Sequence, residues 1–315
     1  MLHSIICIVQ ANGLSEDTVP ILFTNKSFYN NHDLWSMIIN NKRNFTPLMN
    51  ATFINSYERV KFLVEAGANV NMVDDSNQCA LLYSFCKMKD KFKIYEQCKK
   101  RCTECYQNIE DNLKILELLC EHKSNLNILT FDLDNPVFLA VRLNYVPAIK
   151  LFCKYNFDIN HVNEENDTVM SLAIKINSPM ICYYLWKKGA DINSVDFKKH
   201  TFLITMIYGY KNPITYEMIE DVLQHKPNVD AQDCNKADAM IYACMTSSPE
   251  LVELLIKYDV DVNYALMVGI CNNNIEHVKM LCCKNANINY NLMLAQAKKL
   301  KFNDIYKFLL QKRKG

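Results

Sequence analysis

Glycine is scarce in this sequence, with six residues among 315 where roughly 7% is usual. No two of the six lie close together. A loop that holds a phosphate needs several glycines within a few residues, so that backbone N–H groups can close on the anion. The shortage argues against P-loop nucleotide hydrolases, dinucleotide-binding Rossmann folds and kinase glycine-rich loops. The Gly-x-Ser-x-Gly motif of a nucleophile elbow is missing as well.

Long apolar runs and an excess of one charge are also missing. No run of 18 apolar residues occurs, so no membrane-spanning helix is expected. The apolar stretch 2–9 is short and lacks both a basic region before it and a small-residue cleavage site after it, unlike a secretory signal. Lys and Arg number 35 against 34 Asp and Glu, a net charge of +1 that offers no broad field to nucleic acid or an anionic membrane.

The composition and cysteine content of the sequence are typical of a folded intracellular protein. Apolar residues make up 50% and charged residues 22%, which is typical of a folded chain and not of a disordered one. We interpret the 14 cysteines as reduced thiols, mostly packed as small hydrophobic residues. These observations predict a monomeric protein of the cytoplasm or nucleus, in the host cell if it comes from a virus or parasite, that binds neither nucleic acid nor membrane.

One short pattern recurs along the chain: a small or turn-forming residue, then Asn or Asp, an aliphatic residue, and Asn or Asp again. Gly67-Ala-Asn-Val-Asn71 and Gly189-Ala-Asp-Ile-Asn193 show it most clearly. The final residues of its seven copies stand at 71, 127, 160, 193, 230, 263 and 289. Their separations are 56, 33, 33, 37, 33 and 26, which indicates a repeat of 33 residues with two insertions and one contraction.

Each copy of the pattern follows an amphipathic stretch of helical period, as with Val60, Leu63 and Val64 before the first. A shorter helix is expected upstream, beginning at sequences such as Thr46-Pro47 and Asn135-Pro136. Proline suits the first helical turn because its missing N–H needs no partner there, and Thr or Asn before it can cap the helix. A left-handed residue is expected after the second helix, supplied by Gly67, Gly189, Lys123, Asn156, Lys226, Asp259 and Asn285.

A 33-residue unit with Thr-Pro-Leu opening one helix and Gly-Ala-Asp-Ile-Asn following a second resembles the ankyrin repeat. The resemblance implies an all-α solenoid of about eight repeats with short β-hairpin fingers in the earlier repeats, in which stacking covers the apolar face of each unit. The units would begin near Thr46, Ala80, Asn135, Thr168, Thr201, Asp238, Tyr264 and Tyr290. Residues 1–44 would form an N-terminal cap and residues 45–315 the repeat array.

The chain departs from this pattern in two places. Tyr264 and Tyr290 directly follow the motif, so the last two repeats are expected to lack fingers. The second repeat carries an insertion of 23 residues near 88–110, expected to be helical and to lengthen both helices of that repeat. It contains Cys98, Cys102 and Cys105, which would share one face of a helix.

Three thiolates on one helix face could hold three corners of a zinc tetrahedron. The spacing is not that of a zinc knuckle, and we interpret the three cysteines as a packing face. No metal or cofactor is therefore predicted, and a metal- or redox-responsive binder remains an alternative. None of the seven histidines has a paired metal spacing, and no serine or threonine has the context of a nucleophile, so the chain is predicted not to be an enzyme.

The resemblance implies a protein–protein interaction module that binds its partner on the concave face, built from fingertips and the inner side of the first helices. Carried over by position, the candidate binding residues are Arg43, Phe45, Phe53, Asp132, Asp134, Arg142, Glu165, Asp167, Lys175, Lys198, His200 and Tyr208. A further alternative is an adaptor that recruits substrate to a ubiquitin ligase, as some viral ankyrin proteins do. Those carry an F-box-like module after the repeats, for which we expect no room here.

Overall fold

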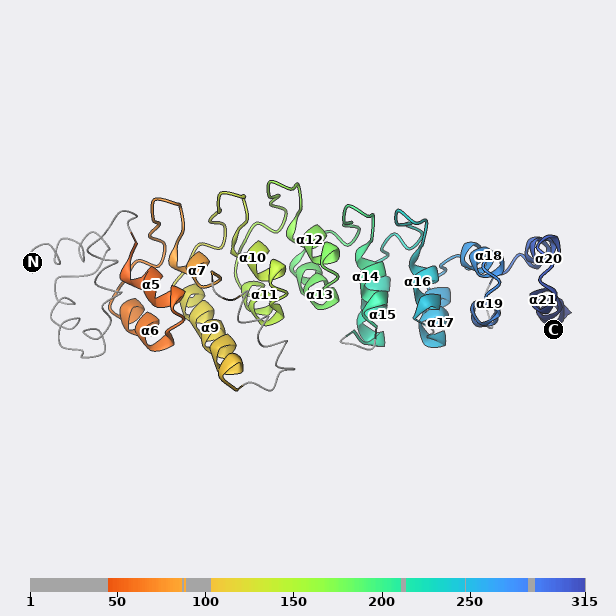
Figure 1. Cartoon of the computed structure of the whole chain (residues 1–315), viewed down its shortest axis with the longest axis horizontal. Helices are drawn as coiled ribbons and strands as arrows, with labels where there is room; N and C mark the ends of the chain where they lie inside the picture. The colour runs from red at the N-terminus through yellow and green to blue at the C-terminus, as the bar shows by residue number, and fades with distance from the viewer. Residues whose placement is uncertain are drawn as a thin grey trace, which may run out of the picture. The chain divides into compact units, whose positions relative to one another are not determined.

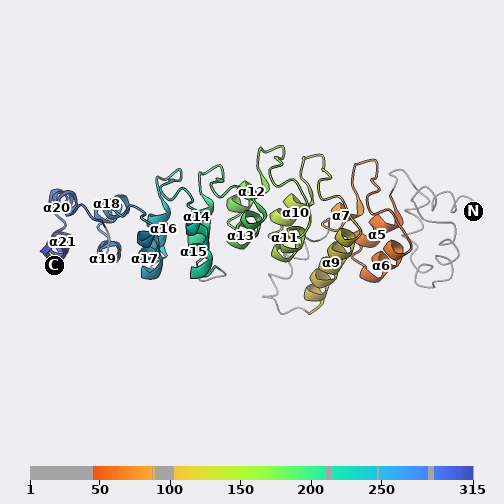
Figure 2. The same cartoon turned by 180° about the vertical axis from the view of Figure 1, so that it is seen from behind.

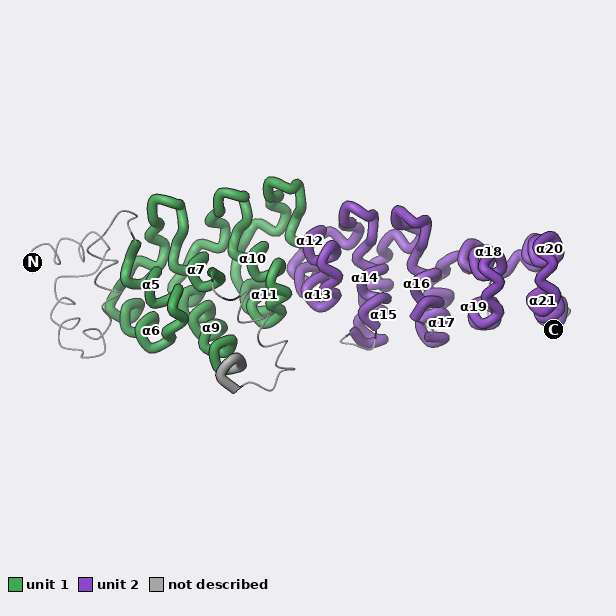
Figure 3. Tube along the Cα trace, in the orientation of Figure 1, with its two compact units in different colours: residues 1–169 green, residues 170–315 purple. Residues whose placement is uncertain are grey.

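The computed structural model describes residues 45–86, 88, 103–210, 214–246, 248–282 and 287–314. The chain divides into two compact units, Met1–Val169 and Met170–Gly315 (Figure 3). Residues 1–44, the predicted N-terminal cap, lie outside the described residues, so that assignment stays a prediction.

Unit 1 is built from pairs of short helices. Figures 1 and 2 show its loops before α7 and α10 rising on one side of the helices. Its helices are α5 (Pro47–Phe53), α6 (Tyr57–Glu65), α7 (Ala80–Tyr83), α9 (Thr103–Glu121), α10 (Pro136–Arg142) and α11 (Val146–Phe152).

Unit 2 repeats the same arrangement. Its first helix, α12 (Val169–Lys175), starts at the last residue of unit 1. No helix in the described ranges is both long and apolar enough to cross a bilayer. The remaining helices are α13 (Pro179–Lys188), α14 (Phe202–Tyr208), α15 (Tyr216–Gln224), α16 (Ala239–Met245), α17 (Pro249–Lys257), α18 (Asn263–Cys271), α19 (Ile275–Leu281), α20 (Tyr290–Lys299) and α21 (Asn303–Lys314).

The helix starts follow the residues that predicted them. The Thr46 hydroxyl accepts the Met49 N–H at 3.1 Å, and Asn135 Oδ1 accepts the N–H groups of Val137 and Phe138. Proline occupies the first turn of α5, α10, α11, α13 and α17. These caps satisfy orphan amides at the helix starts, and the prediction of an all-α repeat fold is confirmed.

The core forms where neighbouring repeats stack. Val60, Leu63 and Val64 of α6 are buried, as the helical period predicted. First helices contact first helices within each unit, as α5 does α7 and α14 does α16. Stacking therefore covers the apolar stripe that a single helix pair would expose.

Within the described residues, five loops precede first helices, and we call them fingers: residues 73–79, 129–135, 162–168, 195–201 and 232–238. Their β character is limited to isolated antiparallel bridges, Val73–Cys79, Val162–Thr168 and Val195–Thr201. α18 begins at Asn263 and α20 at Tyr290, directly after the motif, so neither helix is preceded by a finger (Figure 1).

The insertion of the second repeat contributes to one helix in the described residues. Residues 103–110 form the first turns of α9, which has 19 residues. α7 ends at Tyr83 after four residues, so the first helix of this repeat is not lengthened as expected. The segments 89–102 and residue 87 lie outside the described residues.

The residue after the second helix is left-handed in most repeats. Gly67 and Gly189 have φ of 87° and 111°, and Lys123, Lys226 and Asp259 have φ of 63°, 53° and 59° at the same place. Asn156 was expected to be left-handed and is not, because α11 ends earlier, at Phe152, and the turn after it closes differently. Asn285 lies outside the described residues.

Candidate protein-binding surface

A side chain at the base of each finger fixes the turn above it: the Thr130 hydroxyl in the finger 129–135, where it accepts the Asp134 N–H at 3.2 Å, and a carboxylate or carboxamide in the others. In four fingers its Oδ1 accepts the backbone N–H groups two and four residues later, at 2.8–3.0 Å. These side-chain acceptors add to the backbone hydrogen bonds that close the same turns. The residues that do this are Asp74, Asn163, Asp196 and Asp233, all of them buried.

The first cluster of candidate residues surrounds Tyr83 at the start of unit 1. The ring of Tyr83 lies edge-on to Phe45 and Phe53, with centroids 4.9 and 6.2 Å away. Its hydroxyl donates to Asp74 Oδ2 at 2.6 Å. Phe45 and Phe53 are thus brought together by a residue that sequence reasoning did not nominate, while Arg43 lies outside the described residues.

The second cluster centres on Asp134, whose side chain is buried in unit 1. Arg142 Nε donates to Asp134 Oδ2 at 2.6 Å, and its Nη2 reaches Glu165 Oε1 at 3.3 Å. Asn163 Nδ2 donates to the other oxygen of Asp134 at 2.9 Å. The hydrogen bond to Asp134 raises the pKa of Arg142 above its ordinary value. The guanidinium therefore has a structural partner before any ligand arrives.

A hollow of about 390 Å³ opens over this second cluster. Asp132, Glu164 and Glu165 contribute exposed carboxylates to its lining, and the Glu164 N–H donates to the Asp132 carbonyl at 3.3 Å, which links two adjacent fingers. Asp167 is buried, only 9% exposed. The surface of this hollow is therefore acidic, and the nominated carboxylates of Asp134 and Asp167 are buried and not part of its exposed charge.

The third cluster lies in unit 2 and is aromatic and basic. Phe197 is 68% exposed and Tyr208 58%. The ammonium groups of Lys175 and Lys198 lie 5.8 and 5.5 Å from the centre of the Phe197 ring, within the range of a cation–π contact. With Tyr242 these residues line a hollow of about 340 Å³. Lys175, Lys198, His200 and Tyr208 are thus brought together in one hollow, and their role in partner binding stays a prediction.

His200 occupies the floor of this hollow between two buried carboxylates. Its Nδ1 lies 3.0 Å from Asp196 Oδ2 and its Nε2 3.6 Å from Asp233 Oδ2. Tyr242 donates to Asp233 Oδ2 at 2.9 Å. Burial, and then this hydrogen bond, raise the pKa of Tyr242 to about 12.

Asp233 itself stays charged. Burial acts to raise its pKa, but the Ala237 N–H, the Tyr242 hydroxyl and the nearby His200 outweigh it, so the pKa lies below the ordinary range of an aspartate. Each ring nitrogen of His200 is turned toward a carboxylate, so the ring is held between two neighbouring fingers.

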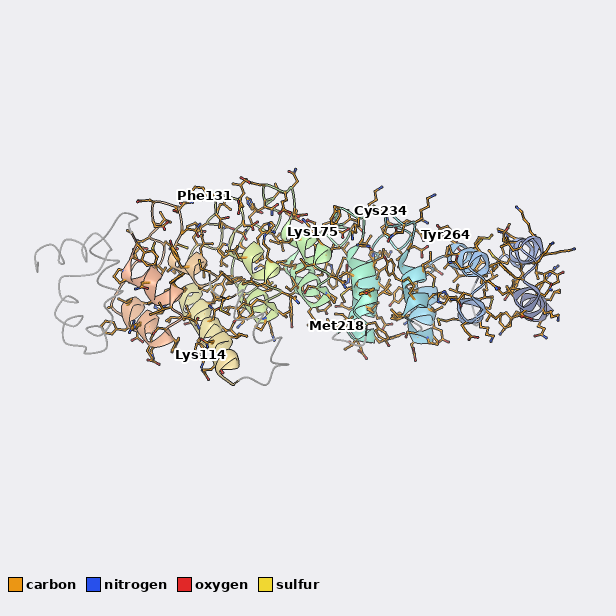
Figure 4. The ribbon with its side chains drawn as sticks, viewed as in Figure 1. Lys114, Phe131, Lys175, Met218, Cys234 and Tyr264 are labelled. Carbon is orange, nitrogen blue, oxygen red and sulfur yellow. The ribbon has the colours of Figure 1, made fainter. Side chains whose placement is uncertain are left out.

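The fingertips of the two units carry opposite charges. In unit 1 their acidic residues are Asp75, Asp132, Asp134, Glu164, Glu165 and Asp167, with no Lys or Arg. In unit 2 the tips 197–200 and 234–237 hold no acid, and their charged residues are Lys198, Lys199 and Lys236. Phe131 and Lys175 mark the finger side of each unit in Figure 4, and Lys114 and Met218 mark the opposite end of the helices.

Sequence reasoning nominated Phe45, Phe53 and Tyr208 but missed four other aromatic residues of this surface: Tyr83, Phe131, Phe197 and Tyr242. Phe197 and Phe131 each stand directly after the finger base, and both are largely exposed. Tyr83 and Tyr242 each stand nine residues after the aspartate to which they donate. Comparing equivalent positions of the 33-residue frame could have found both pairs.

Metal ligands do not gather in the described part of the chain, where no group of three or more His, Cys, Asp or Glu side chains is placed to hold an ion. Cys98 and Cys102 lie outside the described residues. Cys105 lies in α9, but its side chain is not described. The alternative of a cysteine-based metal site stays a prediction.

Several solved structures of ankyrin repeat proteins are similar to this chain. Crystal structures of the ankyrin repeat protein EF0377, of the human ASB11 ankyrin repeat domain and of an ankyrin repeat domain from Acinetobacter baumannii AYE are similar. They are 16%, 16% and 17% identical, with TM-scores of 0.48, 0.45 and 0.48. The matches cover 68%, 69% and 68% of this chain and 98%, 85% and 97% of the others.

No curated protein matches the sequence. A family model of three ankyrin repeats matches residues 104–196 and 206–291, more than half of the chain, and a single-repeat model matches residues 43–75. The chain therefore belongs to the ankyrin-repeat family.

Proposed function

We propose that this chain binds a protein partner on the face made by its fingertips and the ends of its first helices, and that it does so without catalysis. Ankyrin repeats are generally protein–protein interaction modules, and the fold is typically a non-enzymatic scaffold. The observation that carries the proposal is the pair of exposed aromatic side chains, Phe197 and Tyr208, beside the lysines of unit 2. Exposed aromatic groups in a hollow are the usual anchors of an interface.

The finger bases support a mechanism of rigid display. The tip 197–200 is held by two hydrogen bonds to Asp196, and the tip 234–237 by two to Asp233. The Cys234 N–H donates to the Lys198 carbonyl at 2.9 Å and links the two fingers. A surface ordered in this way before binding loses less conformational entropy when the partner docks.

The role of His200 supports binding over catalysis. Its two ring nitrogens face Asp196 and Asp233, which already accept other hydrogen bonds, so the triplet fixes one finger against the next. A histidine in this setting stabilises the surface on which the exposed side chains stand.

The test is affinity purification from the native cellular setting with quantitative mass spectrometry. The wild-type chain is compared with the double variant Phe197→Ala, Tyr208→Ala, and with the control Met218→Ala, which truncates a half-exposed side chain at the far end of α15 (Figure 4). A specific partner should fall about tenfold or more with the double variant, since interface anchors contribute about 2 kcal/mol or more each.

Retention of every partner by the double variant would contradict the proposed face. Circular dichroism must show that both variants remain helical, because lost folding would mimic lost binding. Ligase subunits among the partners would support the adaptor alternative, which would use the same face to hold its substrate.

A further inference from the structure

The hollow of unit 2 is selective in its chemistry. We propose that it binds a protein segment in which an aromatic or aliphatic side chain stands next to carboxylates. This inference rests on the proposed function, and it names the kind of sequence that unit 2 would recognise.

The apolar part of the hollow fits one inserted side chain. Its volume of about 340 Å³ lies at the lower end of the range for ligand pockets. Tyr208 and Tyr242 stand edge to face with their centroids 6.5 Å apart, and Phe197 closes the finger side. An apolar side chain placed here would cover the rings of Phe197 and Tyr208, which are otherwise more than half exposed, a favourable burial of apolar surface.

The exposed charges around this apolar part are positive. Lys175 stands at the end of α12 and Lys198 at a fingertip, and both ammonium groups lie within 6 Å of the Phe197 ring. Lys199 and Lys236 add two exposed cations at the neighbouring tips. A carboxylate beside the inserted side chain could pair with these ammonium groups while its chain neighbours stay in solvent.

A basic ligand finds no acceptor in the same place. Asp196 and Asp233 form the acidic floor, and their side chains are 2% and 1% exposed. Their oxygens already accept backbone N–H groups, and Asp233 also accepts the Tyr242 hydroxyl. A lysine or arginine would therefore meet the ammonium groups at the rim without reaching a carboxylate.

A single-stranded nucleic acid is a weaker fit. Such ligands need a row of stacking rings along a continuous basic track. Here Phe197 is the exposed ring at the tips of unit 2, and the described helices α18 and α20 carry no fingers that would continue the track. The net charge of the whole chain is +1.

The test is a selection from a displayed library of random 12-residue peptides on the full chain. Peptides that enrich on the wild type are then measured by fluorescence anisotropy against Lys175→Glu, Lys198→Glu. The control is Lys298→Glu, Lys299→Glu, which makes the same charge change at the exposed end of α20. A dT12 oligonucleotide is tested in parallel as the nucleic-acid probe.

We expect enriched peptides to share an aromatic or aliphatic residue flanked by Asp or Glu. Their Kd should rise at least tenfold with the first variant and less than twofold with the control, and should also rise between 50 and 300 mM salt. Enrichment of basic peptides, no common pattern, equal binding by both variants, or displacement of the peptide by dT12 would overturn the inference. If cellular partners still depend on Phe197 and Tyr208 in that case, the protein-binding face survives and only its acidic preference is lost.

Discussion

The fingers of unit 1 and of unit 2 share one backbone turn and differ in what they display. Asn163 in unit 1 and Asp233 in unit 2 each accept the backbone N–H groups of the residues two and four positions later, at 3.0 Å for Asn163 and 2.8 Å for Asp233. Above these turns, unit 1 exposes Asp132, Glu164 and Glu165, while unit 2 exposes Phe197 and lysines. The residue at the finger base therefore fixes the backbone turn, while other residues at the fingertip determine its charge.

Two hollows of similar volume result, and they differ in chemistry. The one in unit 1 holds Arg142 in place by carboxylates, while the equivalent Lys175 in unit 2 lies beside an exposed ring. A residue at one position of the repeat is thus structural in one unit and part of a candidate binding surface in the other. The following substitutions measure that contrast.

The largest effect is expected from the finger bases. Asp233→Ala removes the acceptor of two N–H groups and of the Tyr242 hydroxyl, and should lower the free energy of unfolding by about 2–3 kcal/mol, because buried donors lose their partner. Asn163→Ala should cost a similar amount if the turn is the shared element. Urea denaturation followed by circular dichroism measures both.

The control for the finger bases is Asn235→Ala, an exposed tip residue, which should change stability by less than about 0.5 kcal/mol. A small effect of Asp233→Ala beside a large one of Asn163→Ala would show that the two units hold their fingers by different means.

An intermediate effect is expected where the two units use one position differently. Arg142→Ala leaves the buried Asp134 with Asn163 as a remaining donor and should destabilise unit 1 by about 1–2 kcal/mol, less than a fully buried pair because the guanidinium is about one third exposed. Lys175→Ala should cost less than Arg142→Ala, because the Lys175 side chain is exposed and exposed pairs contribute little. Thermal and urea unfolding compare them, and equal losses would mean that Lys175 also has a structural role.

The smallest effect is a gain. Lys123 and Lys226 are left-handed residues in units 1 and 2, with φ of 63° and 53°. Replacing either with glycine relieves the strain of a side chain in that conformation and should raise stability by about 0.5–1 kcal/mol after the greater flexibility of unfolded glycine is counted. The matched variants Lys123→Ala and Lys226→Ala keep the Cβ and should show no gain. A lowered melting temperature for the glycine variants would refute the assigned backbone.

The 33-residue repeat could be predicted from the sequence because the same local signals for helix formation recur in each unit. Period, proline at the helix start and a capping residue all recur every 33 residues, and each acts within its own turn. The ends of individual helices were harder, since Asn156 departs from the frame only because α11 stops at Phe152. That depends on packing, which a repeat pattern does not contain.

For the candidate surface, the sequence predicted which repeat positions the residues occupy, but it did not predict which side chains contact one another. The frame placed Arg142 and Lys175 at equivalent ends of first helices, but the pairing of Arg142 with Asp134 and Glu165 joins residues from two fingers. Phe197 was missed because an aromatic residue in a loop has no periodic signal of its own. Sequence spacing therefore nominated the residues of the candidate face, and contacts across repeats show which of them already have structural partners.

The left-handed residue at each fingertip has a consequence for how the surface can change over generations. Asn77 and Asn166 have φ of 56° and 59° there, Lys199 and Lys236 have φ of 62° and 61°, and Leu133 in the finger 129–135 has φ of 55°. Asparagine and lysine codons differ in one base, so a single mutation can turn a neutral tip into a cationic one while the backbone keeps its turn. A glycine at the same place would hold the turn and offer no side chain to select. Because glycine is scarce, each of these left-handed fingertip positions carries a side chain, and a single substitution there can change the charge of the surface.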